Sequence, residues 1–281
     1  MHQMPSQPGL DLTALRRLTR PRHEHTALVD RIVSHLDQHD GYVAFSGGKD
    51  SLVVLHLALQ AEPNIPIVFF DSGLEYPETI AYLATVGDYL KLPNPVEIEP
   101  AQPDLLTMLI RTGTWDHHSL LRHSPDDVTD TLIVQPAAHA HRRHGPGELW
   151  GVRASESAAR RRLYLASLSR RQPGCACCPG GNRARARHGG IITRKDGTTA
   201  FCPIWDWTDD DVWNYLARHD LPVNPVYDKL RQLGAPARAL RLTSLLDAHQ
   251  LRHGRAVWLR RGWPDIFTAL QQALPRLTEM T

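Results

Sequence analysis

Cysteine, net charge and long apolar runs are all scarce in this sequence of 281 residues. No apolar run reaches about 18 residues, the length that a membrane-spanning helix needs. The opening residues, Met1-His2-Gln3-Met4-Pro5, lack the basic and then apolar order of a secretory signal peptide. The composition, 42% apolar and 22% charged, is that of an ordinary globular protein. We therefore expect a cytoplasmic protein with no membrane partner.

Positive charge is concentrated in one segment, although the formal net charge is only +2. Between positions 153 and 187 a single acid, Glu156, stands among many arginines. The arginines of this segment are Arg153, Arg160, Arg161, Arg162, Arg170, Arg171, Arg183, Arg185 and Arg187. The concentration of charge predicts contact with an anion.

The four cysteines are grouped, three of them in Cys175-Ala176-Cys177-Cys178 and the fourth at Cys202. A reducing compartment argues against disulfides, so the side chains are thiols or metal ligands. Four thiolates near a strand-loop-strand element are suited to an iron–sulfur cluster, such as 4Fe-4S, or to zinc. The alternative is a set of unligated thiols, with Cys202 a small core residue.

Short apolar strands alternate with helices in the first part of the chain. The pattern predicts strands at 42–45, 65–70 and 95–98, with helices over 51–59 and 77–91. Alternation at this spacing is typical of parallel βαβ units, and apolar strands indicate a sheet covered on both faces. We expect an α/β protein with a doubly wound, Rossmann-like parallel sheet.

Helices are expected at both ends of this sheet domain. Two amphipathic helices, 11–20 and 23–38, form a leader, and a basic helical tail covers roughly 236–277. The remaining expected elements are a helix near 103–111, a fourth strand at 149–152, a helix at 155–171, short strands at 191–194 and 199–202, and a helix near 208–219. The expected domains are a helical leader (1–40), a nucleotide-binding domain (41–230) and a helical extension (231–281).

A candidate phosphate cradle, Ser46-Gly47-Gly48-Lys49-Asp50-Ser51, lies between the first strand and the following helix. Open α/β sheets bind ligands at this position, where the helix N-terminus adds about half a positive charge. The glycines allow backbone N–H groups to approach an oxyanion closely. Lys49 adds a full charge, and Ser46 and Ser51 add hydroxyl donors. The alternative, a simple capped turn, leaves the lysine unexplained.

The cradle is not a Walker A loop, because Val43 and Asp50 occupy positions where that motif needs Gly and Ser or Thr. It resembles the PP-loop of ATP pyrophosphatases. The wider run from Tyr42 to Leu57 resembles the phosphoadenosine phosphosulfate (PAPS) reductase family, which also contains the small subunit of ATP sulfurylase, FAD synthetase and DNA phosphorothioation enzymes. The resemblance implies the adenine nucleotide alpha hydrolase-like fold.

Further blocks in the same order along the chain are similar to that family. They are Phe70-Asp71-Ser72-Gly73-Leu74-Glu75-Tyr76-Pro77-Glu78-Thr79, then Gly151-Val152-Arg153-Ala154-Ser155-Glu156-Ser157 with Arg160 and Arg161, and finally Pro203 to Trp213 with Leu221 to Tyr227. The resemblance covers about 40–230.

The resemblance implies a role for several side chains in these blocks. Asp71 and Gly73 would lie near the nucleotide, although Asp71 could instead cap the next helix. Arg153, Glu156 and Arg160 would contact substrate phosphate or sulfate, although Ser155 and Glu156 could merely begin a helix. We expect the tryptophans of the last block, Trp205, Trp207 and Trp213, to be core residues.

The favoured function is ATP cleavage between the α and β phosphates, with adenylyl transfer to an acceptor. Lys49, Ser51, the loop amides and Mg²⁺ would stabilise the leaving pyrophosphate, and Asp50 would orient the loop or the metal. The resemblance also implies an alternative, reduction of PAPS. Assimilatory PAPS reductases use a cysteine near the C-terminus, whereas no cysteine follows Cys202 here. A third interpretation is a non-catalytic module that binds nucleotide or nucleic acid. The acceptor, with nucleic acid as one candidate, and the oligomeric state stay open.

Overall fold

The fold is built on a six-stranded sheet in the order β3-β2-β1-β4-β6-β5. The computed structural model describes residues 11–18, 25–116, 118, 128–171, 185, 187–242 and 254–280. The strands are β1 (Gly41–Ala44), β2 (Ile67–Asp71), β3 (Glu97–Pro100), β4 (Gly147–Trp150), β5 (Ile191–Thr193) and β6 (Thr199–Phe201). Every neighbouring pair is parallel except β5 with β6. The expected α/β fold with a mostly parallel sheet is confirmed.

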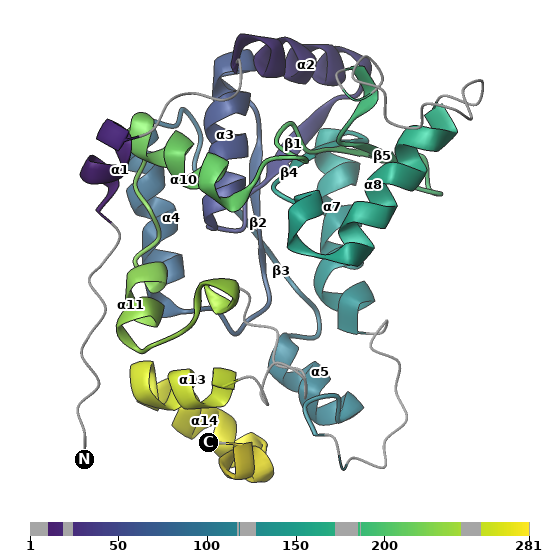
Figure 1. Cartoon of the computed structure of the whole chain (residues 1–281). Coiled ribbons are helices and arrows are strands. Elements are labelled where there is room, and N and C mark those ends of the chain that lie inside the picture. The colour runs from purple at the N-terminus through teal and green to yellow at the C-terminus, as the bar shows by residue number, and fades with distance from the viewer. Residues whose placement is uncertain are drawn as a thin grey trace.

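Alternating side chains of the central strands pack against helices on opposite faces of the sheet. Val43 and Phe69 belong to a core with α3 (Lys49–Ala61), whose apolar residues from Leu52 to Leu55 are fully buried. Tyr42 and Val68 instead form a second cluster with Ala140 of α7 (Gln135–His144). Figure 1 shows α3 and α7 on either side of the strands. Since the side chains of a strand point alternately to its two faces, both faces are apolar and covered.

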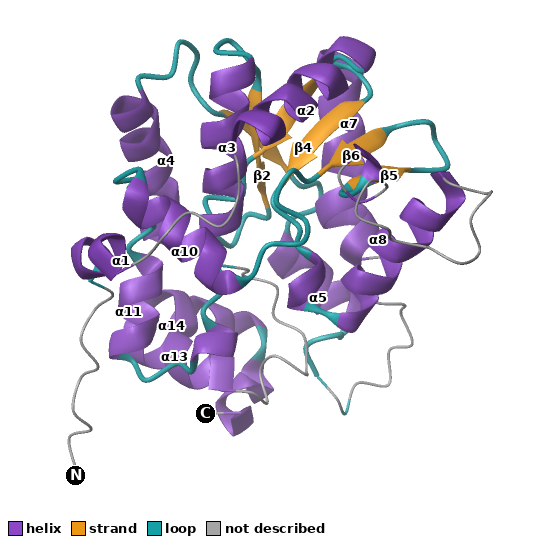
Figure 2. Ribbon diagram, turned by 45° about the horizontal axis from the view of Figure 1, so that its top comes forward, coloured by secondary structure: helices purple, strands orange, loops and turns teal. Residues whose placement is uncertain are grey.

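The remaining helices of the sheet domain surround this arrangement (Figure 2). They are α4 (Pro77–Leu90), α5 (Leu105–Thr112), α8 (Ala158–Arg171), α10 (Asp209–Arg218) and α11 (Val226–Gln232), with a 3-10 turn at Ala154–Glu156. Pro77 lies in the first turn of α4, where its missing N–H removes no intrahelical hydrogen bond. The expected leader consists of α1 (Leu12–Leu18) and α2 (His25–Gln38); α2 packs on α3 and α1 on α10.

The C-terminal helices pack below the sheet rather than extending as one tail. The described part contains α13 (Ala256–Gly262), α14 (Pro264–Ala273) and a 3-10 segment (Pro275–Met280), and Figure 1 shows them beneath α11 and near α5. Trp263, which separates the two helices, stacks on Tyr76 with ring centroids 4.2 Å apart and donates to Glu78 over 2.7 Å. The described helices of the tail are therefore fixed to the start of α4.

The largest departure from the predicted elements is α7, which the sequence pattern did not indicate. Its sequence, QPAAHAHRRH, has few apolar residues, and a π-helical segment (Asp130–Val134) leads into it. Pro136, Ala137 and Ala140 are its buried residues. Because small side chains allow close packing of a helix on the sheet, burial here does not need a strong apolar stripe. Strands β3 and β4 are also displaced by two residues from the predicted positions.

None of the helices in the described ranges has the length and apolar character needed to span a membrane.

Two histidines, buried His35 and half-buried His56, make stability depend on pH. Burial, together with nearby His39 and Arg171, lowers the pKa of His35 to about 4. The pKa of His56 is also lowered to about 4 by burial and by His219 and His25. In the unfolded chain both histidines would bind protons with the ordinary histidine pKa of 6.5. Both groups therefore favour the folded state less as pH falls from 6.5 towards 4.

We predict that the free energy of unfolding, measured by urea denaturation, falls steadily on acidification from about pH 6.5 to about pH 4.5. The contribution of His35 alone should approach a slope of about 1.4 kcal/mol per pH unit. The variant with His35→Gln and His56→Gln should show a flatter dependence, and exposed His118→Gln should keep that of the wild type. Equal slopes in all three proteins would contradict this assignment.

Candidate active site

The loop between β1 and α3 has the backbone geometry of a phosphate cradle. Gly47 has φ +70, and Gly48 forms the N-cap of α3 without a side-chain cap. The Ser46 and Ser51 hydroxyls lie 3.0 Å apart, and Ser51 also donates to the carbonyl of Gly48 over 3.0 Å. Tyr227 Oη accepts from the N–H of Lys49 over 3.1 Å, and the N-terminus of α3 presents its positive dipole to a ligand.

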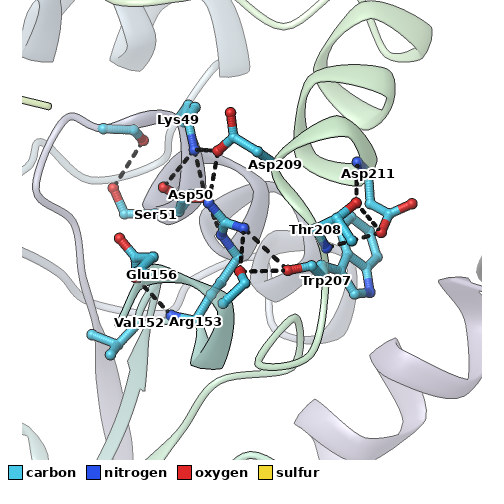
Figure 3. A network of polar contacts seen from close by, with 12 residues as sticks. Lys49, Asp50, Ser51, Val152, Arg153, Glu156, Trp207, Thr208, Asp209 and Asp211 are labelled. Carbon is cyan, nitrogen blue, oxygen red and sulfur yellow. Dashed lines mark hydrogen bonds and ion pairs between the residues drawn. The ribbon is translucent and has the colours of Figure 1, made fainter. Parts of the chain in front are cut away.

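Two buried cations lie beside this loop. Lys49 begins α3 and is 6% exposed, and Arg153, which follows β4, is 3% exposed. Lys49 Nζ lies 3.0 Å from Asp50 Oδ2 and 2.7 Å from Asp209 Oδ1. Arg153 contacts the same two carboxylates, at 2.6 Å from Asp50 Oδ1 and 2.9 Å from Asp209 Oδ1. Figure 3 shows these four side chains, which we call the charge cluster. Its formal charges cancel.

Arg153 is anchored by further hydrogen bonds. Its Nη1 donates to Ser155 Oγ over 2.9 Å and to the carbonyl of Trp207 over 3.0 Å. Its backbone N–H donates to Glu156 over 2.9 Å, in a capping box that begins the 3-10 turn. Burial alone would lower the pKa of Arg153, but Asp50, Asp209 and Glu156 together raise it above its ordinary value. The guanidinium is therefore a fixed positive charge.

Asp209 enters the cluster from the first turn of α10. Thr208 caps this helix, accepting from the N–H of Asp211 while Asp211 Oδ2 accepts from the N–H of Thr208. Asp209 Oδ2 also accepts from Trp213 Nε1 over 3.1 Å. Burial acts to raise the pKa of Asp209, but Lys49 and Arg153 outweigh it and lower the pKa.

Asp209 is not among the site residues predicted from the sequence. The tryptophans of the surrounding block, Trp205, Trp207 and Trp213, are buried as expected. The sequence did contain a signal for an acidic site residue here, because the first turn of α10 has three acids, more than capping of the helix requires.

A cavity of about 1130 Å³ opens at the carboxyl ends of β1, β2 and β4. Most of the candidate residues line it, namely Ser46, Gly48, Lys49, Asp50, Ser51, Arg153, Glu156 and Arg160. Arg160 forms an ion pair with Glu156 at the wall. Trp213 also lines the cavity, with Lys49 Nζ 5.9 Å from the centre of its ring. The crevice is the position where ligands bind in open α/β sheets.

Asp71 and Gly73 do not join the other candidate residues in this cavity. Asp71 Oδ1 accepts from the N–H of Gly73 over 2.8 Å, and Gly73 has φ +77. Asp71 is not the cap of α4 either, because Tyr76 holds that position. Ser72 and Glu75 of the same segment line the cavity instead. Asp71 and Gly73 form a local turn and are not among the residues that line the cavity, and their role toward the nucleotide stays a prediction.

Of the four cysteines, the structure describes only Cys202. The predicted ligands Cys175, Cys177 and Cys178 lie outside the described residues. Cys202 is fully buried, and burial raises the pKa of its thiol. Among the described residues no group of three or more His, Cys, Asp or Glu side chains has an arrangement that could hold a metal. The position of Cys202 favours the alternative in which it is a core residue.

Gly151 brings the end of β4 against the start of α3. A Cβ added to Gly151 would lie 2.6 Å from the backbone N of Ser51 and 2.9 Å from the carbonyl carbon of Asp50. Neither atom can move without displacing the cradle. We predict that Gly151→Ala lowers the free energy of unfolding by about 1–3 kcal/mol. It should also weaken binding of inorganic pyrophosphate in calorimetry.

The matched control is Gly87→Ala in α4, where the added Cβ meets only Leu92 Cδ1 at 3.9 Å. This change should leave both stability and binding close to those of the wild type or slightly raise stability. If Gly151→Ala has the stability and the affinity of the wild type, the close approach of Gly151 to the backbone of Ser51 is not required.

Comparison with known proteins agrees with the geometry. The model of the phosphoadenosine phosphosulfate reductase domain matches residues 41–235. A curated phosphoadenosine 5'-phosphosulfate reductase of Xylella fastidiosa strain M12 is 28% identical over 204 residues, covering 70% of each chain. Sulfate adenylyltransferase subunit 2 of Streptomyces lavendulae is 31% identical over 199 residues, covering 66% of this chain and 55% of that protein. Another Xylella reductase, of strain 9a5c, is matched over 65% of its length.

Solved structures with distant similarity include a PAPS reductase from Candida auris in a phosphate complex. It is 16% identical, with TM-score 0.44 and coverage of 75% of this chain and 93% of that one. The U34-tRNA thiolase NcsA of Methanococcus maripaludis, with its 4Fe-4S cluster, is 12% identical with TM-score 0.39, covering 97% and 86%. The match of the family model covers well over half of the chain. The chain therefore belongs to the phosphoadenosine phosphosulfate reductase family.

Proposed function

We propose that this protein is an enzyme of sulfur metabolism that binds an adenine nucleotide with its phosphates or sulfate in the cavity above α3. The observation that carries the proposal is the pair of buried cations, Lys49 and Arg153, beside the N-terminus of α3. Both cations line the cavity, where an anion from solvent could exchange with one of the carboxylates that pair them. Family membership supports the adenine nucleotide as that partner.

Several candidate residues have a role in this proposal. The amide of Gly48 would donate to the terminal oxygens of the nucleotide, and the Ser51 hydroxyl would do so by turning away from the carbonyl of Gly48. Lys49 and Arg153 would neutralise their charge, and Arg160, at the wall of the cavity, would meet a second anionic group. Asp50, whose oxygens accept from Lys49 and Arg153, would orient these cations or a Mg²⁺ that arrives with the nucleotide, and the metal would add charge neutralisation at the phosphates.

The comparisons support reduction of a sulfonucleotide such as PAPS more strongly than the ATP cleavage that the loop sequence favours. Several curated relatives bear the name phosphoadenosine 5'-phosphosulfate reductase. Reduction requires a thiol that attacks the sulfonate and a supply of electrons. The thiol of Cys202 has no access to the cavity because it is fully buried. The candidate nucleophiles of this chain are therefore Cys175, Cys177 and Cys178.

ATP cleavage between the α and β phosphates is the second candidate. The intact loop with Lys49 and two serines supports it, as does the relative named sulfate adenylyltransferase subunit 2. In this reaction Lys49, Ser51 and the loop amides would stabilise the departing pyrophosphate. The two candidate reactions use the same cradle but differ in whether a thiol is needed.

The grouped cysteines lead to a separate proposal. We propose that Cys175, Cys177 and Cys178 hold an iron–sulfur cluster or zinc, or supply the reducing thiol. Three thiols within four positions, among arginines that lower thiol pKa values, support both uses. Anaerobic purification with iron and zinc analysis distinguishes them, and metal absent at useful stoichiometry would leave the thiol role.

ATP and PAPS should be compared side by side as ligands and as substrates, with pyrophosphate and sulfite as the measured products. We expect nanomolar to micromolar binding of at least one nucleotide, and a loss of about tenfold to a hundredfold in affinity in Lys49→Ala, since a charged hydrogen bond to phosphate is lost. Lys195→Ala, at an exposed position, removes the same charge and should bind normally.

Sulfite release would identify the reductase and pyrophosphate release the ATP-cleaving enzyme. Binding without either product would support a non-catalytic module. The proposal fails if the wild-type protein binds no adenine nucleotide.

A further inference from the structure

One carboxylate from a separate helix holds both buried cations of the cavity. Asp209 Oδ1 lies 2.7 Å from Lys49 Nζ and 2.9 Å from Arg153 Nη2, so a single oxygen bridges α3 and the segment after β4. Its other oxygen accepts from Trp213 Nε1 within α10. These contacts occupy cationic groups that face the cavity. An anionic ligand therefore has to compete with Asp209.

We propose that Asp209 is a positioning residue that acts as an exchangeable counter-ion, orienting Lys49 and Arg153 in the empty site and giving up its place to an oxygen of the nucleotide's charged end. The inference rests on the proposed binding of a nucleotide in this cavity. It adds that the site is electrically balanced before the ligand arrives, and that Asp209, one of the two acids that pair the cations, is the one the ligand displaces.

Exposure distinguishes Asp209 from the other acid of the charge cluster. The Asp50 side chain is 16% exposed, and it lies next to Lys49 in the same helix. The Asp209 side chain is 58% exposed, and it comes from α10. An exposed carboxylate recovers its hydration when it leaves a partner, whereas a buried one does not. Asp209 is therefore the acid whose displacement costs less.

The buried cations account for the need for a counter-ion. Lys49 and Arg153 are almost wholly buried, so leaving either without a negative partner would be strongly unfavourable. A phosphate or sulfate oxygen in the place of Asp209 Oδ1 would keep both cations paired. The exchange changes the partner and preserves the charge balance at the cations. Displacement of Asp209 also leaves its carboxylate close to the ligand, where like charges repel.

The sign of this repulsion gives the test. Asp209→Asn keeps the size of the side chain and removes its charge. With EDTA present to exclude metal, we expect the Asn variant to bind inorganic pyrophosphate about threefold to tenfold more tightly than the wild type in calorimetry, because the competing charge is gone. With the nucleotide that turns over, it should show a lower KM and a kcat reduced by about tenfold, since Lys49 and Arg153 lose the group that orients them.

The matched control is Asp210→Asn, on the same turn of α10 but at an exposed position with no part in the charge cluster. It changes the net charge equally and should leave Kd, KM and kcat unchanged. Asp209→Glu, which retains the charge, should restore a Kd near that of the wild type. Asp209→Ser provides a second uncharged variant should the Asn protein fail to fold.

Tighter binding is a result that structural damage would not produce. Weaker binding in Asp209→Asn, or a Kd equal to that of Asp210→Asn, would overturn the counter-ion role while leaving the proposed function intact. Absence of pyrophosphate and nucleotide binding in both the wild type and the variants would overturn the proposed function, and the counter-ion role with it.

Discussion

The compensation of two buried cations by two carboxylates is the constraint on which the candidate site depends. Lys49 and Arg153 are buried at the end of the sheet, and each contacts both Asp50 and Asp209. An uncompensated charge at this depth would be expelled or neutralised, because desolvation of an ion costs several kcal/mol. The charge cluster therefore links α3, the segment after β4 and α10.

The order of the strands makes this link possible. Strands β1 and β4 are neighbours, although more than one hundred residues separate them, and their carboxyl ends reach the same crevice. Gly151 allows the chain leaving β4 to pass directly against the backbone of Ser51. Arg153, two residues later, then reaches Asp50. In open α/β sheets, ligands bind in the crevice outside the carboxyl ends of the strands, at the point where the strand order reverses.

Membership of the PAPS reductase family supports the proposed binding of an anionic adenine nucleotide, for which two reactions are proposed at the same cradle. Both need positive charge where the terminal oxygens lie, which Lys49, Arg153 and the N-terminus of α3 provide. They differ in the requirement for a thiol. Cys202 is fully buried, so we propose Cys175, Cys177 and Cys178 as the source of the thiol that reduction would need.

The sequence by itself determined the α/β class, most of the helices and strands, and the cradle from Ser46 to Ser51, because these depend on local periodicity and on glycines at a strand-to-helix junction. Arg153 also followed from a local motif. Tertiary structure alone decided that Asp209 joins Lys49, that Asp71 turns back on Gly73 outside the cavity, and that the alanine- and histidine-rich segment at α7 covers a face of the sheet. These outcomes depend on contacts between segments that are distant in the sequence. Helical periodicity and short motifs describe only neighbouring residues, so they do not predict which side chains the folded sheet brings together.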